Sequence, residues 1–393
     1  MWTHSWKKAF SSLFVNLKFA LNNPHFTAHF LRESRTLEKI KARYHKTGVI
    51  TLSNIRKLGL KLTTACNLRC PMCYQWRPTG LHSAIGASHL DFSRCGKLFE
   101  FSRQFAADVV LTGGEPMLSP HFIDFIDEFC GNGSYCYICT NGTLINEYIV
   151  ELEEYSNRLG FLVSLDGPEP IHDEIRGKGK FKETVSGLRH LISRKKENKS
   201  NWLVGVEVTM LPANVNDLHE IIKICERIGI DWMVFNHLWI INEEARKEYQ
   251  EFCAAFNNPR PISLHGFDAP IDDENFLEKA IAFCLSVKDR KNRIPVFLKP
   301  DLSPEGIRSY WRGRIRRPGE YLKLALKMDI EANGDVSPFK NFPDISLGNI
   351  YESSIAEILS SDRYRQVSEY LLKNNLYICH ACPDYYNLGL AQK

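Results

Sequence analysis

Between residues 57 and 236 the sequence alternates between short strand patterns and longer helix patterns, and this alternation limits the possible folds most strongly. The expected strands cover residues 58–62, 108–112, 135–139, 161–165, 204–210 and 231–236. Such alternation is typical of βαβ units and a parallel sheet. Six units are too few to close an eightfold barrel. The sequence therefore predicts an α/β fold, a partial (β/α)6 TIM-like barrel.

Short polar and glycine-rich motifs follow several of these strands. A cysteine-rich loop follows the first strand, Gly113–Pro116 follows the second, Thr140–Gly142 the third and Asp166–Gly167 the fourth. In a barrel of parallel strands, ligands bind at the carboxyl ends of the strands. We therefore expect these motifs to gather at one mouth of the barrel.

The cysteine-rich loop contains three thiols within eight residues, Cys66, Cys70 and Cys73. This spacing suits one polynuclear centre better than three disulfide halves, and iron–sulfur clusters are held by such thiolate runs, usually of four cysteines. With three thiols, one iron stays open for another ligand, and an open position indicates chemistry. A zinc site completed by a distant His or Cys is the alternative.

The pattern Cys-x3-Cys-x2-Cys followed by Tyr74 resembles the signature of the radical S-adenosylmethionine (SAM) superfamily. The resemblance implies that Cys66, Cys70 and Cys73 hold a [4Fe–4S] cluster whose fourth iron is chelated by SAM. It further implies that an electron cleaves SAM to methionine and a 5′-deoxyadenosyl radical, which takes hydrogen from a substrate. An external electron donor such as flavodoxin or ferredoxin would supply that electron.

The segment Gly113, Gly114, Glu115 and Pro116 resembles the motif with which this family binds the amino group of SAM. Glycine allows the backbone to approach a ligand closely, and proline fixes the turn. The alternative is an ordinary turn between a strand and a helix. Its position one unit after the cysteine loop favours the functional interpretation.

Further SAM contacts are implied by the resemblance at the ends of later strands. Ser164 and Asp166 match the position that binds the ribose hydroxyls, although Asp-Gly is also a common turn pair. Tyr74 corresponds to an aromatic residue that lies against the adenine. Asn141 belongs to a Thr-Asn-Gly turn that either supports the cofactor or only shapes the loop.

Other residues near the same mouth are weaker candidates. Thr209 and Asn236 end the fifth and sixth strands, and His172 and Arg176 lie in a loop expected over residues 168–180. Cys136 and Cys139 also form a Cys-x2-Cys pattern. Because residues three apart on a strand point to opposite faces, we interpret these two as core thiols.

The C-terminal part contains a predicted hairpin with its turn at Asn333-Gly334, then a helix over 354–373, and ends with Cys379 and Cys382. This order resembles the SPASM or twitch extension, a small α+β domain that binds auxiliary iron–sulfur clusters. The position after the hairpin where a cysteine is expected is Phe339. Two thiols are too few for a usual cluster, so an auxiliary cluster is doubtful.

Residues 1–56 are predicted to form a basic helical extension. Two interpretations are open: peripheral contact of residues 1–30 with an anionic membrane surface, or packing on the catalytic domain or a partner. The remaining predicted divisions are a radical SAM barrel at 57–240, a helical bridge at 241–320 and the SPASM-like domain at 321–393.

Composition restricts the partners and the compartment. The net charge of +4 does not require a nucleic-acid partner, and the 12 cysteines form no secretory framework. A cytoplasmic location, with membrane association left open, is therefore expected. The substrate is a peptide or a small molecule such as a metabolite, carbohydrate or lipid-linked compound. A non-catalytic iron–sulfur or zinc-binding scaffold is the alternative function.

Overall fold

A parallel sheet organises the described part of the chain. The computed structural model describes residues 13–47, 54–77, 80–81, 86–198, 200–289, 292–315, 323–374 and 376–381. Within these ranges the strands form one sheet in the order β7-β6-β5-β4-β3-β2-β1-β8-β9. The strands are β1 Lys57–Thr63, β2 Asp108–Gly113, β3 Cys136–Thr140, β4 Leu159–Ser164, β5 Leu203–Met210, β6 Trp232–His237, β7 Val296–Lys299, β8 Lys327–Ile330 and β9 Val336–Ser337.

The six expected strands are confirmed, and the sheet continues beyond them at both edges. β7 pairs parallel with β6, so the segment predicted to bridge out of the barrel is a seventh strand. At the other edge β8 pairs parallel with β1, with Lys57 opposite Lys327 and Leu60 opposite Ile330. The predicted hairpin is confirmed, because β9 pairs antiparallel with β8. The C-terminal hairpin therefore extends the barrel sheet.

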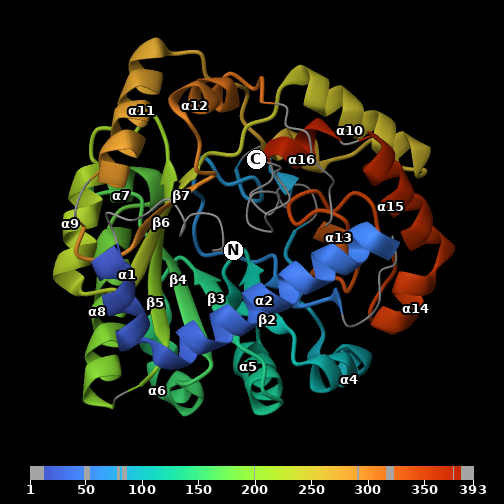
Figure 1. Cartoon of the computed structure of the whole chain (residues 1–393), viewed down its shortest axis with the longest axis horizontal. Coiled ribbons are helices and arrows are strands. Elements are labelled where there is room, and N and C mark those ends of the chain that lie inside the picture. The colour runs from blue at the N-terminus through green and yellow to red at the C-terminus, as the bar shows by residue number, and fades with distance from the viewer. Residues whose placement is uncertain are drawn as a thin grey trace.

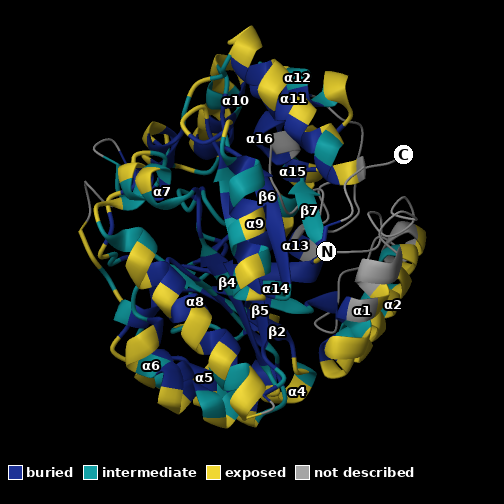
Figure 2. Cartoon of the chain, turned by 90° about the vertical axis from the view of Figure 1, so that its left-hand side faces the viewer, coloured by how far each residue is buried: buried dark blue, intermediate teal, exposed yellow. Residues whose placement is uncertain are grey.

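Helices cover the outer face of the sheet, and further helices precede and follow it (Figure 1). They are α1 Leu13–Asn22, α2 Pro24–Thr47, α4 Gly96–Phe105, α5 Phe122–Gly131, α6 Ile145–Leu152, α7 Glu169–Arg176, α8 Lys180–Glu197, α9 Leu218–Ile228, α10 Glu243–Ala255, α11 Glu274–Asp289, α12 Pro304–Trp311, α13 Lys323–Leu326, α14 Ile355–Ser360, α15 Asp362–Asn374 and α16 Tyr377–Ala381. Helices α5, α6 and α8 expose one face and bury the other (Figure 2).

Two expectations about helices are corrected. The segment 168–180, expected to be a loop, contains α7, which begins after Pro168 and buries His172 and Ile175. Proline is compatible with the first turn of a helix, and burial of these two side chains stabilises it. The single helix expected over 354–373 is divided into α14 and α15, because Ser361 has an extended backbone.

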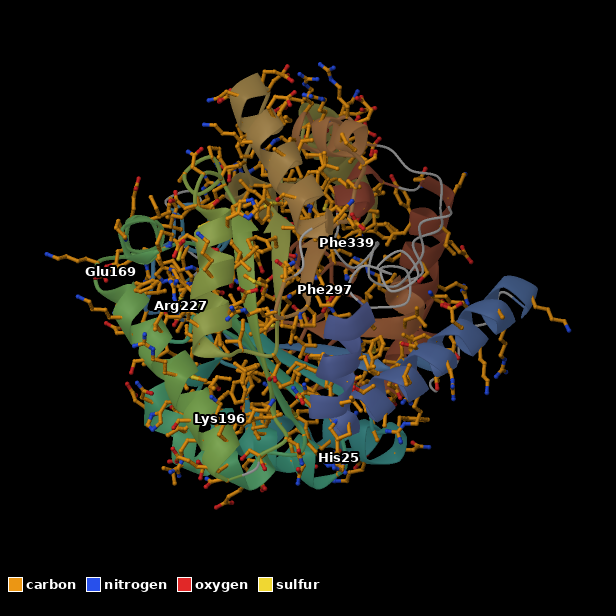
Figure 3. All side chains as sticks on the ribbon, turned by 60° about the vertical axis from the view of Figure 1, so that its left-hand side comes forward. His25, Glu169, Lys196, Arg227, Phe297 and Phe339 are labelled. Carbon is orange, nitrogen blue, oxygen red and sulfur yellow. The ribbon has the colours of Figure 1, made fainter. Side chains whose placement is uncertain are left out.

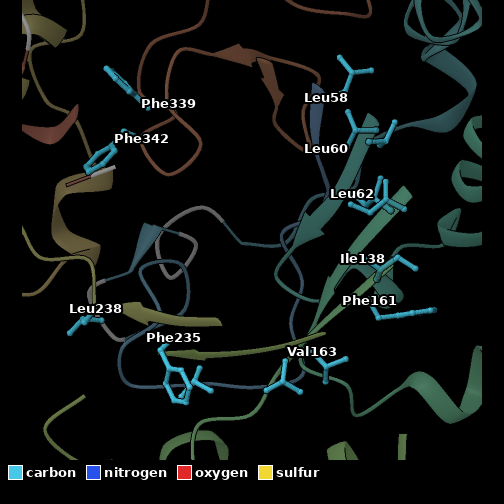
Figure 4. Close-up of a cluster of buried hydrophobic side chains, with 14 of the residues drawn as sticks. Leu58, Leu60, Leu62, Ile138, Phe161, Val163, Phe235, Leu238, Phe339 and Phe342 are labelled. Carbon is cyan, nitrogen blue, oxygen red and sulfur yellow. The ribbon is translucent and has the colours of Figure 1, made fainter. Parts of the chain in front are cut away.

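The main core lies between the outer face of the sheet and the helices. Side chains alternate along a strand, so Leu58, Leu60 and Leu62 of β1 share one face, and all three are buried in this core (Figure 4). Figure 3 labels Lys196 on α8 and Arg227 on α9, two helices of the surrounding layer, as well as Phe297 on β7 and Phe339 in the loop after β9.

The N-terminal helices close the end of the barrel where the strands begin. Phe19 and Phe26 pack against Leu203 and Trp232, the first residues of β5 and β6. Buried His29 lies 2.9 Å from the carboxylate of Asp108, at the start of β2. These contacts show that the described part of the extension, residues 13–47, packs on the barrel. Within the described residues, none of the helices combines the length and apolarity needed to cross a bilayer.

Candidate functional site

The three predicted cysteines lie on the loop that leaves the carboxyl end of β1. Cys70 is buried, whereas Cys66 and Cys73 are partly exposed, and none of them forms a disulfide. The backbone N–H of Cys73 donates to the carbonyl of Cys70 over 3.0 Å, so the loop turns tightly here. Burial raises the pKa of the Cys66 thiol to about 12, and it also raises the pKa of Cys70.

Hydrogen bonds fix this loop to the ends of the neighbouring strands. The side chain of Asn67 accepts from the Asn141 amide over 2.8 Å and donates to Thr143 over 2.9 Å. The Gln75 amide donates to the carbonyl of Gly113 over 2.9 Å. The predicted cofactor residue Asn141 therefore supports the cysteine loop directly.

Gly113 and Gly114 allow the second strand end to approach the start of the cysteine loop. A Cβ on either glycine would lie 2.2 Å from a backbone oxygen, that of Thr63 or of Ala65. The N–H of Glu115 donates to the Ala65 carbonyl over 2.8 Å. Larger residues would force these two segments apart, so the glycines set the distance between them.

Glu115 is fully buried and connects the ends of β2 and β3. Its carboxylate accepts from the Thr140 hydroxyl and the Asn141 N–H, each over 2.8 Å, and from the Met117 N–H over 3.3 Å. Burial raises its pKa to about 7. The side chain is thus engaged within the protein, which the motif alone did not indicate.

Ser164 and Asp166 differ in accessibility at the end of β4. Ser164 is partly exposed, but Asp166 is buried and both of its carboxylate oxygens have partners. One oxygen accepts from the Thr209 N–H over 2.8 Å, and the other from Arg176 Nε over 2.6 Å. Asp166 therefore connects the end of β4 to Arg176 of α7 and to Thr209 of β5.

His172 and Arg176 extend this network from α7. The Nδ1 atom of buried His172 accepts the N–H of Asp166 over 3.2 Å, which leaves the proton of the neutral ring on Nε2. Burial and the nearby charge of Arg176 lower the pKa of His172 to about 4. The same Arg176 charge opposes the effect of burial on the pKa of Cys70, so α7 brings a cation close to the cysteine loop.

Tyr74 stacks on Phe267, a contact that sequence reasoning missed. The two rings are 5.5 Å apart and nearly parallel. Phe267 follows the short helical turn Ser263–Gly266, and Arg77 holds the same segment through a 2.8 Å ion pair with Asp268. No local sequence pattern relates two positions that are almost 200 residues apart. The sequence offers only the aromatic residue type of Phe267 as an indication.

Accessible side chains line the inner face of the sheet near the same end. Along β3, β4 and β5, buried and partly exposed residues alternate, and Cys139, Ser164, Glu207 and Thr209 retain accessible surface. Cys136 is buried and Cys139 is partly exposed, so the two lie on opposite faces as expected, but the interpretation of both as core thiols is correct for Cys136 only. Asn236 donates its amide to Glu207. Solvent therefore reaches the inside of the open barrel.

The donor chemistry of the cysteine loop fits an iron–sulfur cluster. Three thiols lie on one short loop, and Arg176 supplies positive charge nearby. In the described ranges, no three His, Cys, Asp or Glu side chains are already arranged to hold a metal ion. The loop thus offers the donors without being closed around a centre, and metal binding would release the thiol protons.

Comparisons with known proteins agree with this site. Residues 60–225 match the Radical SAM superfamily, and residues 324–383 match SPASM, described as an iron–sulfur cluster-binding domain. The chain belongs to the radical SAM superfamily. Members of the superfamily are enzymes that use a [4Fe–4S] cluster and SAM.

Two curated relatives extend over most of this radical SAM chain. One is the tungsten-containing aldehyde ferredoxin oxidoreductase cofactor-modifying protein of Pyrococcus furiosus, 25% identical over 84% of this chain and 87% of the relative. The other is the antilisterial bacteriocin subtilosin biosynthesis protein AlbA of Bacillus subtilis, 24% identical over 84% of this chain and 67% of the relative.

Solved structures share the fold. Streptococcus suis SuiB bound to the precursor peptide SuiA has a TM-score of 0.57 at 15% identity, covering 90% of this chain and 76% of SuiB. Native anSMEcpe with bound AdoMet has a TM-score of 0.54 at 17% identity, covering 85% of this chain and 88% of that one. At these identities the likeness concerns the barrel architecture alone.

Proposed function

We propose that Cys66, Cys70 and Cys73 hold the [4Fe–4S] cluster of this radical SAM enzyme, with one iron left to SAM. When bound, these two groups supply a 5′-deoxyadenosyl radical that abstracts hydrogen from a substrate. The observation that carries the proposal is the three-thiol loop fixed at the mouth of an accessible barrel. Arg176 would offset part of the negative charge of the thiolates.

The proposed SAM contacts divide into direct and supporting groups. The backbone of Gly113, Gly114, Glu115 and Pro116 would receive the amino group, and Ser164 the ribose. Tyr74 would lie against the adenine, since it directly follows the third cysteine. The resemblance implies Asp166 and Asn141 as contacts too, but their hydrogen bonds favour a supporting role for their side chains.

The substrate class that the relatives favour is a peptide. AlbA and the sporulation killing factor maturation protein SkfB of Bacillus subtilis carry names from peptide biosynthesis, although the match to SkfB spans only 47% of that relative. A small metabolite, carbohydrate or lipid-linked compound is the second candidate, favoured by the polar side chains of Glu207, Thr209 and Asn236 on the inner face of the barrel. An external flavodoxin or ferredoxin would deliver the electron.

We further propose a cytoplasmic protein with peripheral membrane contact at its N-terminal helices. Leu17 and Leu21 are 54% and 70% exposed on α1, and exposed Leu31 and Arg32 follow on α2. Apolar side chains beside basic ones suit an anionic lipid surface. Flotation with vesicles containing anionic lipid tests this, since Leu17→Gln with Leu21→Gln should abolish co-flotation. Unchanged flotation of the double variant would exclude this contact.

The activity is tested by anaerobic reconstitution with iron and sulfide, followed by dithionite and SAM. Wild-type protein should form 5′-deoxyadenosine, measured by mass spectrometry, and Cys66→Ala should lower its rate by more than about 100-fold. Cys225→Ala, which changes a buried thiol of α9, is the matched control and should remain active. A cluster-loaded wild type that neither binds SAM nor forms the product would favour a non-catalytic iron–sulfur scaffold, and zinc in place of iron would favour a zinc-binding one.

A further inference from the structure

We propose that the C-terminal domain of this chain holds no auxiliary iron–sulfur cluster and that an aromatic core has taken the place of the metal-binding interior. The matched family is described as cluster-binding, so this domain differs from its family in this respect. It does not depend on whether Cys66, Cys70 and Cys73 hold the first cluster.

The C-terminal domain contains few thiols. The sequence from residue 285 to residue 378 contains no cysteine, and the matched region 324–383 contains only Cys379 and Cys382. Iron–sulfur clusters are normally held by four cysteines. Two thiols separated by two residues leave at least half of such a centre without protein ligands.

Buried aromatic side chains occupy the loop after the hairpin. Phe339 and Phe342 follow β9 closely, and they are 2% and 0% exposed. Figure 4 shows the two side chains near each other, apart from the leucines of β1. An accessible cluster site would leave space beside this loop, whereas these two side chains have almost none of their surface exposed.

Aromatic rings from α10 surround these phenylalanines. Tyr249 lies 5.0 Å from Phe342 and 6.2 Å from Phe339, measured between ring centroids. Phe252 lies 5.9 Å from Phe339 and contacts Tyr370 of α15 at 5.4 Å. These distances are those of packed aromatic pairs, which stabilise an apolar interior.

The polar groups nearby are also engaged. The carboxylate of Asp344 accepts from the Tyr249 hydroxyl over 3.0 Å, from the Ile262 N–H over 2.7 Å and from the Ser263 hydroxyl. Cys379 is fully buried in the main apolar core.

The aromatic core continues to the cysteine loop. Phe342 stacks on Phe267 at 4.5 Å, and Phe267 in turn stacks on Tyr74, the residue after Cys73. Trp239 packs edge-on against both phenylalanines at 5.5 Å. The C-terminal domain therefore positions Tyr74 through the stack of Phe342 on Phe267, and it contributes no second redox centre.

Iron and sulfide counting on the reconstituted full chain tests the inference. Wild-type protein should bind about four irons per chain. A variant with Cys66→Ala, Cys70→Ala and Cys73→Ala should bind none, and its electron paramagnetic resonance spectrum after reduction should be silent. Retention of about four irons by this variant, or about eight by the wild type, would overturn the proposal.

A second variant keeps the test decisive if the first one misfolds. Cys379→Ser with Cys382→Ser, in the presence of the three loop cysteines, should leave the iron content and the spectrum unchanged. A loss of iron in this variant would show that the C-terminal thiols ligate metal. A wild type without any iron would instead remove the proposed function, so the two failures are distinguishable.

Discussion

The cysteine loop and the C-terminal domain lie in regions that match two iron–sulfur families. Their side chains differ, because the loop carries thiols and the C-terminal interior carries aromatic rings. The loop presents three thiols and is fixed by hydrogen bonds from Asn141 and Gln75. The C-terminal interior presents Phe339 and Phe342 packed against α10. Family membership transfers the fold to both regions, but only the side chains decide which region can bind metal.

The two regions should also respond differently to mutation. Around the loop, buried carboxylates of Glu115 and Asp166 accept several hydrogen bonds each, so removal of an acceptor leaves buried donors unpaired. In the C-terminal interior, truncation of a ring leaves a cavity. The comparison can therefore be tested through the size and pH dependence of the stability losses.

The largest loss is expected from Phe342→Ala. The side chain is fully buried between Phe267 and Tyr249, so the free energy of unfolding should fall by about 4 kcal/mol. Urea denaturation at constant pH measures this, with Leu372→Ala on the partly exposed face of α15 as control. A loss below about 1 kcal/mol would mean that the aromatic interior is not tightly packed.

Glu115→Ala should have the next largest effect. The substitution leaves the Thr140 hydroxyl and the N–H groups of Asn141 and Met117 without their acceptor, at a cost of about 3 kcal/mol. Urea denaturation of the metal-free protein measures the loss. Exposed Glu147→Ala, on nearby α6, should change stability by less than about 0.5 kcal/mol. Equal stabilities of the two variants would argue against a structural role of Glu115.

The sequence predicted the regular part of this molecule well because its signals are local. Alternating leucines marked β1, and the motif positions marked the strand ends that gather around the cysteine loop. The sequence does not reveal β7 as a strand of the sheet, because it is four residues long and its pairing with β6 spans some sixty residues. The pairing of β8 with β1 is still more distant in sequence.

The roles of individual site residues were harder to predict. A carboxylate after a strand can face a ligand or a neighbouring residue, and Asp166 faces Arg176 and the Thr209 N–H. The stack of Tyr74 on Phe267 likewise depends on the path of the helical bridge. Residue types at strand ends predict where a site lies, whereas tertiary contacts determine what each side chain does there.

A smaller loss of stability, which depends on pH, is expected from His172 in the hydrogen-bond network near the cysteine loop. Because the pKa of His172 falls to about 4 on folding, the unfolded chain binds an additional proton below its ordinary value of 6.5. Stability is therefore lost as the pH falls from 6.5 toward 4, by about 2 kcal/mol between pH 6.5 and 5. His172→Asn keeps an acceptor for the Asp166 N–H and should remove this component.

Denaturation of wild type and His172→Asn at several pH values measures the difference between their slopes. The loss caused by Phe342→Ala should be the same at pH 5 and pH 7, because ring packing involves no proton. Parallel pH profiles of wild type and His172→Asn would contradict a buried neutral histidine at this position.

The smallest effect is expected at the outer face of α1. Leu17 and Leu21 are largely exposed, whereas Phe19 between them packs on the barrel. Leu17→Gln with Leu21→Gln should therefore change the free energy of unfolding by less than about 0.5 kcal/mol, while Phe19→Ala should lower it by about 3 kcal/mol. Urea denaturation without lipid measures both. A large loss in the double variant would mean that these leucines stabilise the fold, and the vesicle experiment could then no longer be interpreted as a test of a surface. A small loss would confirm that one helix presents two faces, with the inner face closing the barrel and the outer one available to a partner.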